Sequence, residues 1–288
     1  MSEFTLIKAR DGVALAVRHW PAVGEPRASV LIVHGLGEHG GRYDRTAGIL
    51  AGRGFDCRAS DLRGFGASEG PRAYVARIDV WLDDLADQLA LLTGLSRPVV
   101  LLAHSMGGLV ACRYAETDRP QPDLLVLSAP ALGDDLPAWK RSLASILGRI
   151  APKARIKNDF DGSILSRDPA VGSDYLSDPL NVHFTTTRLG AIILSLQAPT
   201  IADLGRIRIP TLVIHGGADH LVPTTSSEVF QGRPGIERRV LPGLAHESLN
   251  EPEGPQVAAD IADWIEAHLP ASGPPAPSAD ASGAGSPS

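Results

Sequence analysis

A serine in a turn of small residues is the first place in this chain where a reaction could occur. Ser105 lies in Ala103-His104-Ser105-Met106-Gly107-Gly108, after an apolar run at 99–102 with the length of a buried strand and before a run that suits a helix. Small residues around a serine are typical of a nucleophile elbow, because a bulky neighbour would collide with the adjoining strand or helix. Ser105 is therefore a candidate nucleophile. The alternative is a chance serine in a glycine-rich turn.

A serine hydroxyl is a poor nucleophile at neutral pH and needs a base to take its proton. Asp219 and His246 are suited to assist it, since each lies in a loop after a predicted strand, at 209–215 and 237–241. An imidazole can act as the base, and a carboxylate can orient it and stabilise its protonated form. His246 alone occupies the loop after the last strand. The other candidate histidines lie before the elbow, beside the serine or the aspartate, or late in the last helix: His34, His39, His104, His220 and His268.

Two backbone N–H groups are candidates for stabilising an oxyanion. The N–H of Met106 would lie at the start of the helix after the elbow, where partial positive charge favours a developing anion. The N–H of Leu36 lies in His34-Gly35-Leu36-Gly37-Glu38-His39-Gly40-Gly41, directly after a predicted strand at 29–33. Ligands of α/β sheets bind at the carboxyl ends of strands, which favours this function over a flexible surface loop.

The elements that must position these residues alternate along the chain. A turn at Arg10-Asp11-Gly12 predicts an antiparallel hairpin of strands at 4–8 and 13–20. Further strands are expected at 29–33, 55–60, 99–102, 124–128, 209–215 and 237–241, with helices ending near 53, over 75–95, after 105 and over 257–269. This alternation predicts an α/β fold, with a mostly parallel sheet and helices on both faces.

The alternation stops between 131 and 207, so we expect a first part of the core at 1–130, a helical cap at 131–207 and a second part of the core at 208–269. Apolar residues at helical spacing predict cap helices at 139–150 and 186–196, with a polar, turn-rich stretch at 157–179 between them. The apolar faces are expected to cover the active site, or to pack on the core. The Pro, Ala, Ser and Gly of 270–288 predict a disordered tail.

Charged residues of the core are expected to be structural. We predict an ion pair between Asp61 and Arg63, and loop-bracing roles for Glu38 and Arg42. The acids of the 75–95 helix are expected to lie on a solvated face: Asp79, Asp83, Asp84 and Asp87.

Composition excludes several classes of protein. The net charge of −6 over 288 residues argues against nucleic-acid binding, which requires a basic face. No apolar run approaches the roughly 18 residues of a membrane span, and the N-terminus does not read as a signal peptide, so a cytoplasmic location is expected. Cys57 and Cys112 lie in apolar segments and are expected to be buried thiols, with neither a disulfide nor a metal site.

With these residues placed, the chain resembles the monoacylglycerol lipase branch of the serine α/β-hydrolases, also described as lysophospholipase-like or serine aminopeptidase-like. The resemblance runs from about Asp11 to Leu269. Its motifs are His34-Gly35-Leu36-Gly37-Glu38-His39 with Arg42-Tyr43, Asp61-Leu62-Arg63-Gly64-Phe65-Gly66-Ala67-Ser68, His104-Ser105-Met106-Gly107-Gly108, Ser166-Arg167-Asp168-Pro169 with Asp178-Pro179-Leu180, Asp219 to Pro223, and His246-Glu247-Ser248-Leu249-Asn250-Glu251-Pro252.

The resemblance implies particular roles at matching positions. The family's nucleophile, acid and base fall on Ser105, Asp219 and His246, and its oxyanion donors are the N–H groups of Leu36 and Met106. Two positions depart from the family pattern, since Ala103 replaces the first elbow glycine and Phe65 stands where histidine is common. Neither removes a catalytic group, and both leave room for an altered substrate fit.

The function implied is hydrolysis of carboxylic esters, with monoacylglycerol the expected substrate, through an acyl-serine intermediate and without metal or organic cofactor. The cap is expected to contact a membrane surface peripherally, and the oligomeric state stays open. Alternatives on the same fold are a lysophospholipase, a short-chain carboxylesterase or a peptidase. A perhydrolase-like or C–C bond hydrolase would have a different cap, and a non-catalytic binding protein normally lacks a member of the triad.

Overall fold

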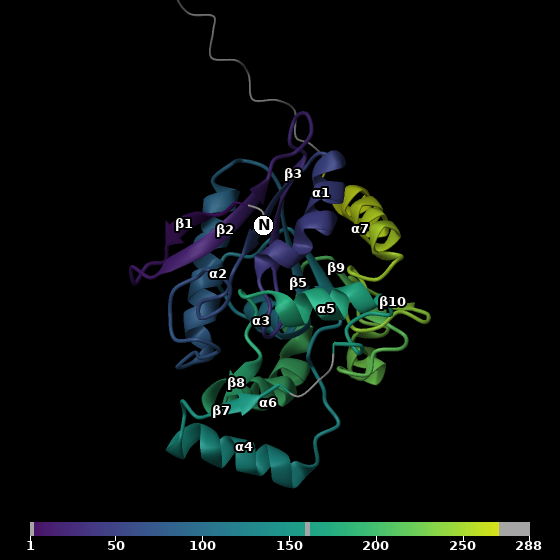
Figure 1. Cartoon of the computed structure of the whole chain (residues 1–288). Helices are drawn as coiled ribbons and strands as arrows, with labels where there is room; N and C mark the ends of the chain where they lie inside the picture. The colour runs from purple at the N-terminus through teal and green to yellow at the C-terminus, as the bar shows by residue number, and fades with distance from the viewer. Residues whose placement is uncertain (1–2, 159–161, 271–288) are drawn as a thin grey trace, which may run out of the picture.

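An eight-stranded, mostly parallel sheet forms the centre of the molecule (Figure 1). The computed structural model describes residues 3–158 and 162–270. The strand order is β1-β2-β4-β3-β5-β6-β9-β10, with antiparallel pairing of β1 with β2 and of β2 with β4 and parallel pairing elsewhere. The strands are β1 Thr5–Lys8, β2 Ala14–Trp20, β3 Ala28–Val33, β4 Phe55–Ser60, β5 Val99–His104, β6 Leu124–Ser128, β9 Thr211–Gly216 and β10 Ile236–Leu241. The predicted hairpin and α/β fold are confirmed.

Helices cover both faces of the sheet because its central strands are apolar on both sides. Along β3, Leu31 packs with helices α2 (Ile78–Thr93) and α3 (Ser105–Ala115). Its neighbour Ile32 packs on the other face with α1 (Asp44–Gly52) and α7 (Gly254–His268). A short 3-10 helix, η1 (Gly40–Tyr43), and a longer one, η3 (Thr224–Phe230), complete the core.

Between β6 and β9 the chain forms α4 (Ala138–Ile150), β7 (Arg155–Lys157), α5 (Pro169–Ser177), β8 (Phe184–Thr186), α6 (Thr187–Asp203) and η2 (Leu204–Arg206). Figure 1 shows α4, α6 and the small β7-β8 sheet at one end of the molecule, while α5 crosses the core. The two predicted cap helices are present. The cap boundaries at 131 and 207 stay a prediction. A disordered tail was expected at 270–288, and its residues after Pro270 lie outside the described part of the chain.

Helix α5 was missed because the stretch 157–179 is rich in turn-forming residues. Its start carries a recognisable signal, however. The side chain of Asp168 accepts a hydrogen bond from the N–H of Ala170, and Pro169 occupies the first turn, where a missing N–H costs nothing. The short β7-β8 pair had no comparable signal.

The predicted ion pair between Asp61 and Arg63 is wrong. Asp61 instead pairs with Arg18 of β2 at 2.6 Å, with both side chains buried. Arg63 pairs with Asp84 at 2.7 Å, and this acid is buried against it rather than solvated. Asp61 and Arg63 are two residues apart but point to different sides of the turn. Each side chain therefore pairs with a residue that is distant in the sequence.

Other acids of α2 also have basic partners. Asp83 and Asp87 pair with Arg119 and Arg10 at 2.9 and 2.6 Å. The acidic face of this helix is therefore partly an ion-pair network. Cys57 and Cys112 are free and buried, as predicted. Within 3–158 and 162–270, no helix is long and apolar enough to span a membrane.

Candidate active site

The turn between β5 and α3 holds Ser105 in a backbone conformation that only a tight turn requires. Its φ of 50° is in the left-handed region, which costs a non-glycine residue about 1–3 kcal/mol and persists only where the surroundings enforce it. A Cβ on Gly107 would collide with the carbonyl oxygen of His34, and one on Gly108 would lie 2.9 Å from Cα of Pro130. Crowding against β3 and the end of β6 therefore explains why small residues surround the serine.

The structure brings the three predicted residues into one chain of hydrogen bonds. Nε2 of His246 lies 2.9 Å from Oγ of Ser105, and Nδ1 of the same ring lies 2.7 Å from Oδ2 of Asp219. All three residues are buried. The serine hydroxyl can donate to Nε2 while the Nδ1 proton is held by the carboxylate. The arrangement can therefore draw a proton away from the serine oxygen.

Asp219 remains an anion in this buried position because it accepts several hydrogen bonds. Burial alone would raise the pKa of Asp219, but hydrogen bonds from His215 and His246, the charge of His246 and the N–H of Val222 hold it well below its usual range. Its Oδ1 accepts from the N–H groups of Leu221 and Val222 at 2.8 and 2.9 Å. His215 was missed because nothing in its local sequence marks it as a partner of the aspartate.

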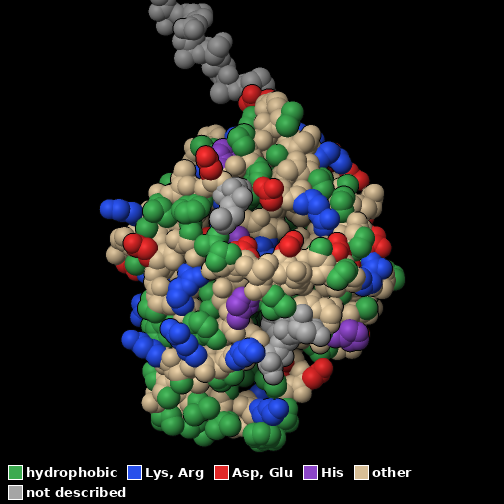
Figure 2. Space-filling view, in the orientation of Figure 1, with side chains coloured by type: hydrophobic (Ala, Val, Ile, Leu, Met, Phe, Trp, Pro, Cys, Tyr) green, Lys and Arg blue, Asp and Glu red, His purple; other side chains and the backbone are tan. Residues whose placement is uncertain are grey.

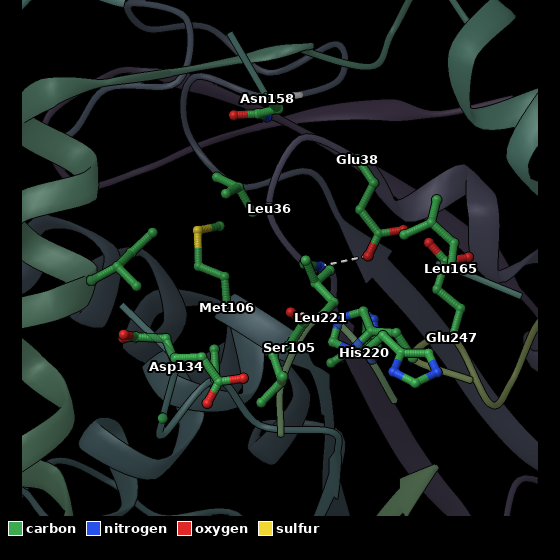
Figure 3. A pocket seen from close by; sticks show the side chains of 18 of the residues that line it. Leu36, Glu38, Ser105, Met106, Asp134, Asn158, Leu165, His220, Leu221 and Glu247 are labelled. Carbon is green, nitrogen blue, oxygen red and sulfur yellow. Dashed lines mark hydrogen bonds between the residues drawn. The ribbon is translucent and has the colours of Figure 1, made fainter. Parts of the chain in front are cut away.

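The loop after β3 approaches Ser105 closely. A Cβ on Gly35 would lie 3.2 Å from Cβ of Ser105, and the N–H of Gly35 donates to Oε1 of Glu38 at 2.6 Å. Leu36 follows this glycine and lines the same pocket as Met106 and Ser105 (Figure 3). The loop is therefore fixed beside the serine by a carboxylate.

A buried charge network braces this loop. Nη1 of Arg42 lies 2.8 Å from Glu38 and 2.6 Å from Glu247, and the hydroxyl of Tyr43 donates to Glu38 at 2.9 Å. Burial opposes ionisation of Glu38, but the charge of Arg42 holds its pKa well below its usual range. The predicted bracing role of Glu38 and Arg42 agrees with these contacts. Glu247, next to His246, is the partner that sequence reasoning missed.

His104 packs directly against the candidate base. The ring centroids of His104 and His246 are 4.7 Å apart, and Nδ1 of His104 lies 3.1 Å from the carbonyl oxygen of Ser128, to which it can donate. Burial and the neighbouring His246 lower the pKa of His104 to about 4. At neutral pH His104 is uncharged, so it does not repel a protonated His246.

The remaining candidate histidines have separate places. His34 accepts the N–H of Leu62 at 2.8 Å, and His39 contacts Asp178 of the cap at 2.9 Å. His220 lines the pocket beside the aspartate, whereas His268 stacks on Trp264 at the end of α7. None of these contacts Ser105 among the described interactions.

A pocket of about 500 Å³ opens over Ser105. In Figure 3, Leu36 and Met106 lie to one side of the serine and Glu38 and Glu247 to the other. Apolar lining also comes from the cap and from the loop after β9: Ala131, Leu136, Leu165, Ile193, Leu194, Leu221 and Val222. The pocket is thus apolar over much of its wall, with the carboxylates of Glu38 and Glu247 on one side of the serine and that of Asp134 on the other.

Both cap helices were expected to cover the active site, but only one of them lines the pocket. Ile193 and Leu194 of α6 line the pocket. The apolar residues of α4 instead face outward, with Trp139 63% and Ile150 73% exposed. The spacing of apolar residues predicted helix α4 correctly, but it does not indicate which surface the apolar face of the helix contacts. In the described residues, no cluster of His, Cys, Asp or Glu could hold a metal ion.

Comparisons with known proteins place the chain in a family. The family described as "Serine aminopeptidase, S33" matches residues 24–253. The monoacylglycerol lipase of Mycolicibacterium smegmatis is 32% identical, over 90% of this chain and 95% of that protein. The phospholipase YtpA of Bacillus subtilis is also 32% identical, over 81% of this chain and 93% of its own.

Among solved structures, the monoacylglycerol lipase of Paleococcus ferrophilus superposes with a TM-score of 0.79. Its sequence is 30% identical, and the match covers 88% of this chain and 99% of the other. The predictions of an α/β-hydrolase fold and of a carboxylic ester hydrolase are confirmed by these matches. The chain belongs to the serine aminopeptidase S33 family, in the monoacylglycerol lipase-like branch of the serine α/β-hydrolases.

Proposed function

We propose that the protein hydrolyses monoacylglycerols to fatty acid and glycerol, with Ser105 as nucleophile, His246 as base and Asp219 as the acid that orients it. The observation that carries the proposal is the hydrogen-bond chain from Ser105 through His246 to Asp219, at the floor of a largely apolar pocket. The named lipase relatives support the substrate class.

Acylation begins when Oγ of Ser105 attacks the ester carbonyl and Nε2 of His246 takes the hydroxyl proton. The carbonyl oxygen becomes an oxyanion, which accepts hydrogen bonds from the N–H groups of Leu36 and Met106. Each such donor is worth about 3–4 kcal/mol in the transition state. The intermediate then collapses, the bond to the alcohol oxygen breaks, and His246 gives its proton to the departing glycerol.

Deacylation repeats these steps with water. His246 takes a proton from water as the water oxygen attacks the acyl carbonyl, and the same N–H groups hold the second oxyanion. Collapse of this intermediate breaks the bond to Oγ, and His246 returns its proton to Ser105. The free fatty acid leaves, and no group outside the chain is consumed apart from water.

A lysophospholipid is the second candidate substrate, because the 32% identical relative from Bacillus subtilis is named a phospholipase. The two candidates share the acyl chain and differ in the alcohol, which carries a phosphate in one and none in the other. Among the charged residues that line the pocket, Glu38 and Glu247 are carboxylates paired with a single arginine, Arg42. An excess of negative charge there disfavours a phosphate and accords with glycerol.

The experiment is a measurement of fatty-acid release from monoacylglycerols of several chain lengths, with a diacylglycerol and a lysophospholipid in parallel. Wild type and Ser105→Ala are compared at equal concentrations. We expect turnover of monoacylglycerols by the wild type and a loss of about 10⁶-fold in the variant. Faster turnover of the lysophospholipid would replace the substrate assignment. Equal rates in the two proteins would refute the role of Ser105.

We also propose that the cap contacts a lipid surface through α4. The outward face of this helix exposes Trp139, Leu143, Ile146 and Ile150. Figure 2 shows hydrophobic side chains gathered at the end of the molecule where α4 lies. Within 138–157, the sequence has no Asp or Glu and contains Lys140, Arg141, Arg149, Lys153, Arg155 and Lys157.

An apolar helix face with basic neighbours is the pattern of a helix that lies in a membrane interface. This contact would bring the pocket to its water-poor substrate. Sedimentation with vesicles of zwitterionic lipid, with and without anionic lipid, tests it. We expect binding that strengthens with anionic lipid. Absence of binding to vesicles whose lipids the protein hydrolyses would refute the contact. A cytoplasmic location stays a prediction.

A further inference from the structure

His215 lies at the end of β9, four residues before the candidate acid. Its side chain is fully buried, and its Nε2 lies 3.1 Å from Oδ2 of Asp219. This carboxylate oxygen is the one that also accepts from Nδ1 of His246 at 2.7 Å. Nε2 of His215 lies, in addition, 3.0 Å from the carbonyl oxygen of Val222. The carboxylate is thus shared by two imidazole rings.

The surroundings of His215 determine where its proton resides. Nε2 faces two acceptors, a carboxylate and a carbonyl, so it must carry hydrogen. Nδ1 is buried and has no hydrogen-bond partner among the described residues, so a proton there would be unsatisfied. The contacts therefore place hydrogen on Nε2, from which His215 donates to Asp219.

We propose that His215 is a positioning residue that fixes the carboxylate of Asp219 toward His246. The N–H groups of Leu221 and Val222 hold Oδ1, and His215 holds Oδ2, so both oxygens are fixed before His246 makes its own bond. His215 touches neither the serine nor the pocket and acts through Asp219. The inference rests on the proposed roles of Ser105, His246 and Asp219.

The groups around the rings of His215 and His246 determine how loss of the His215 donor should affect catalysis. Asp219 faces both His215 and His246, and the end of β5 adds neutral His104 beside His246. Glu38 and Glu247 are the next carboxylates in the vicinity of His104. A carboxylate that loses one of its donors binds the proton donor on the same oxygen more strongly and is less firmly oriented. We therefore expect slower chemistry and an acid limb displaced to higher pH.

Two variants of similar size separate donation from packing. In His215→Gln the amide N–H can donate from nearly the same position as Nε2, whereas His215→Met fills the volume without a donor. The probe is hydrolysis of p-nitrophenyl butyrate from pH 5 to 9. For the methionine variant we expect kcat to fall roughly 10-fold or more, as for a lost hydrogen bond to a charged group, with KM unchanged. The glutamine variant should retain most of kcat.

Three results would overturn the proposal: wild-type kcat and pH profile in folded His215→Met, equal losses in both variants, or a change confined to KM. Should the methionine variant fail to fold, the wild type itself remains informative. Nitrogen-15 NMR, with the His215 signals assigned by their absence in His215→Gln, should find hydrogen on Nε2. Hydrogen on Nδ1 would contradict the inference. An inactive wild type would refute the proposed function instead, which keeps the two failures distinct.

Discussion

The segment between β6 and β9 has two parts that differ in how they are held. The first, called the α5 part, is helix α5 with the residues on either side of it, and it is bound to the core at several points. The second, called the α4 part, is helix α4, which packs mainly against α6 and exposes its apolar face. Both parts were expected to form one cap. The difference separates a part that supports the site from a part that faces outward.

The α5 part is attached by polar contacts to the loops of the active site. The N–H of Val182 donates to the carbonyl oxygen of Gly37 at 2.8 Å, and the N–H of Glu247 donates to that of Leu165 at 2.7 Å. The guanidinium of Arg42 lies over the ring of Tyr175, 5.1 Å from its centroid. These bonds join the loop before α1 and the loop of His246 to the same cap segment.

The α4 part has fewer such attachments. Gly148 is its only buried residue, where a side chain would collide with Ala191 of α6. Arg141 contacts Asp134 and Gln197 at 2.6 and 2.8 Å. Few buried contacts mean a low free energy for local displacement. We infer that changes in α5 should alter stability and catalysis together, and that changes in α4 should alter lipid contact alone.

The largest effect is expected where the α5 part meets the buried charges. Arg42→Met leaves Glu38 and Glu247 buried without their cation, which should lower the free energy of unfolding by about 3–5 kcal/mol. Urea denaturation at pH 7 measures it. Arg42→Lys, which keeps the charge, should lose less. A loss below about 1 kcal/mol for the methionine variant would mean that the network does not hold this part.

A collision at the same junction should have the next largest effect. Gly37 has a φ of 78°, and a Cβ there would lie 2.5 Å from Oη of Tyr175 and 2.7 Å from the carbonyl oxygen of Val182. Gly37→Ala should lose about 1–3 kcal/mol of stability and reduce kcat, because the neighbouring Leu36 is displaced. Gly232→Ala is the matched control, since its φ is 71° and nothing lies within 4 Å. Equal effects would show that backbone strain alone is responsible.

Substitutions on α4 should leave stability nearly unchanged. Ile150→Ser is expected to shift the free energy of unfolding by no more than about 0.5 kcal/mol, because the side chain is largely exposed. Binding to anionic vesicles should fall severalfold, while hydrolysis of a water-dispersed short ester is retained. Val23→Ser is an exposed apolar control far from the cap in sequence. Comparable vesicle binding by the two variants would contradict a docking role for α4.

The smallest effect concerns the far end of α6, where Asp203 pairs with Arg113 and through it with Glu116. Burial raises the pKa of Glu116 to about 7, despite the arginine. The folded protein therefore holds this proton more tightly than the unfolded chain, so stability conferred by it is full below about pH 4.5 and is lost as pH rises toward 7.

Glu116→Gln should remove that loss, so its stability should decline less than that of the wild type between pH 4.5 and 7.5. Urea midpoints at several pH values measure the difference. Parallel pH dependence in the two proteins would show that Glu116 does not retain its proton.

Local patterns sufficed for the elements that position the site. The apolar run before Ser105 and the small residues around it predict β5 and its turn, because both depend on near neighbours in the chain. The spacing of Trp139 to Ile150 likewise predicts α4.

Pairings between distant residues could not be obtained in this way. Asp61 pairs with Arg18 on the neighbouring strand β2, and Glu247 pairs with Arg42 because two loops pack together. His215 and Asp219 are only four residues apart, yet their contact is equally hidden, because it depends on how the chain turns back after β9. Such contacts depend on the finished fold, and a sequence pattern names the charged residue without naming its partner.

The most direct test of the account is stoichiometric labelling of the wild type with a p-nitrophenyl alkylphosphonate, which mimics the ester and forms a stable bond to an activated serine. We predict release of one p-nitrophenolate per chain, with the phosphonyl group on the peptide that contains Ser105. Labelling of another residue, or no labelling of a protein that hydrolyses esters, would contradict the assignment of Ser105 as the nucleophile.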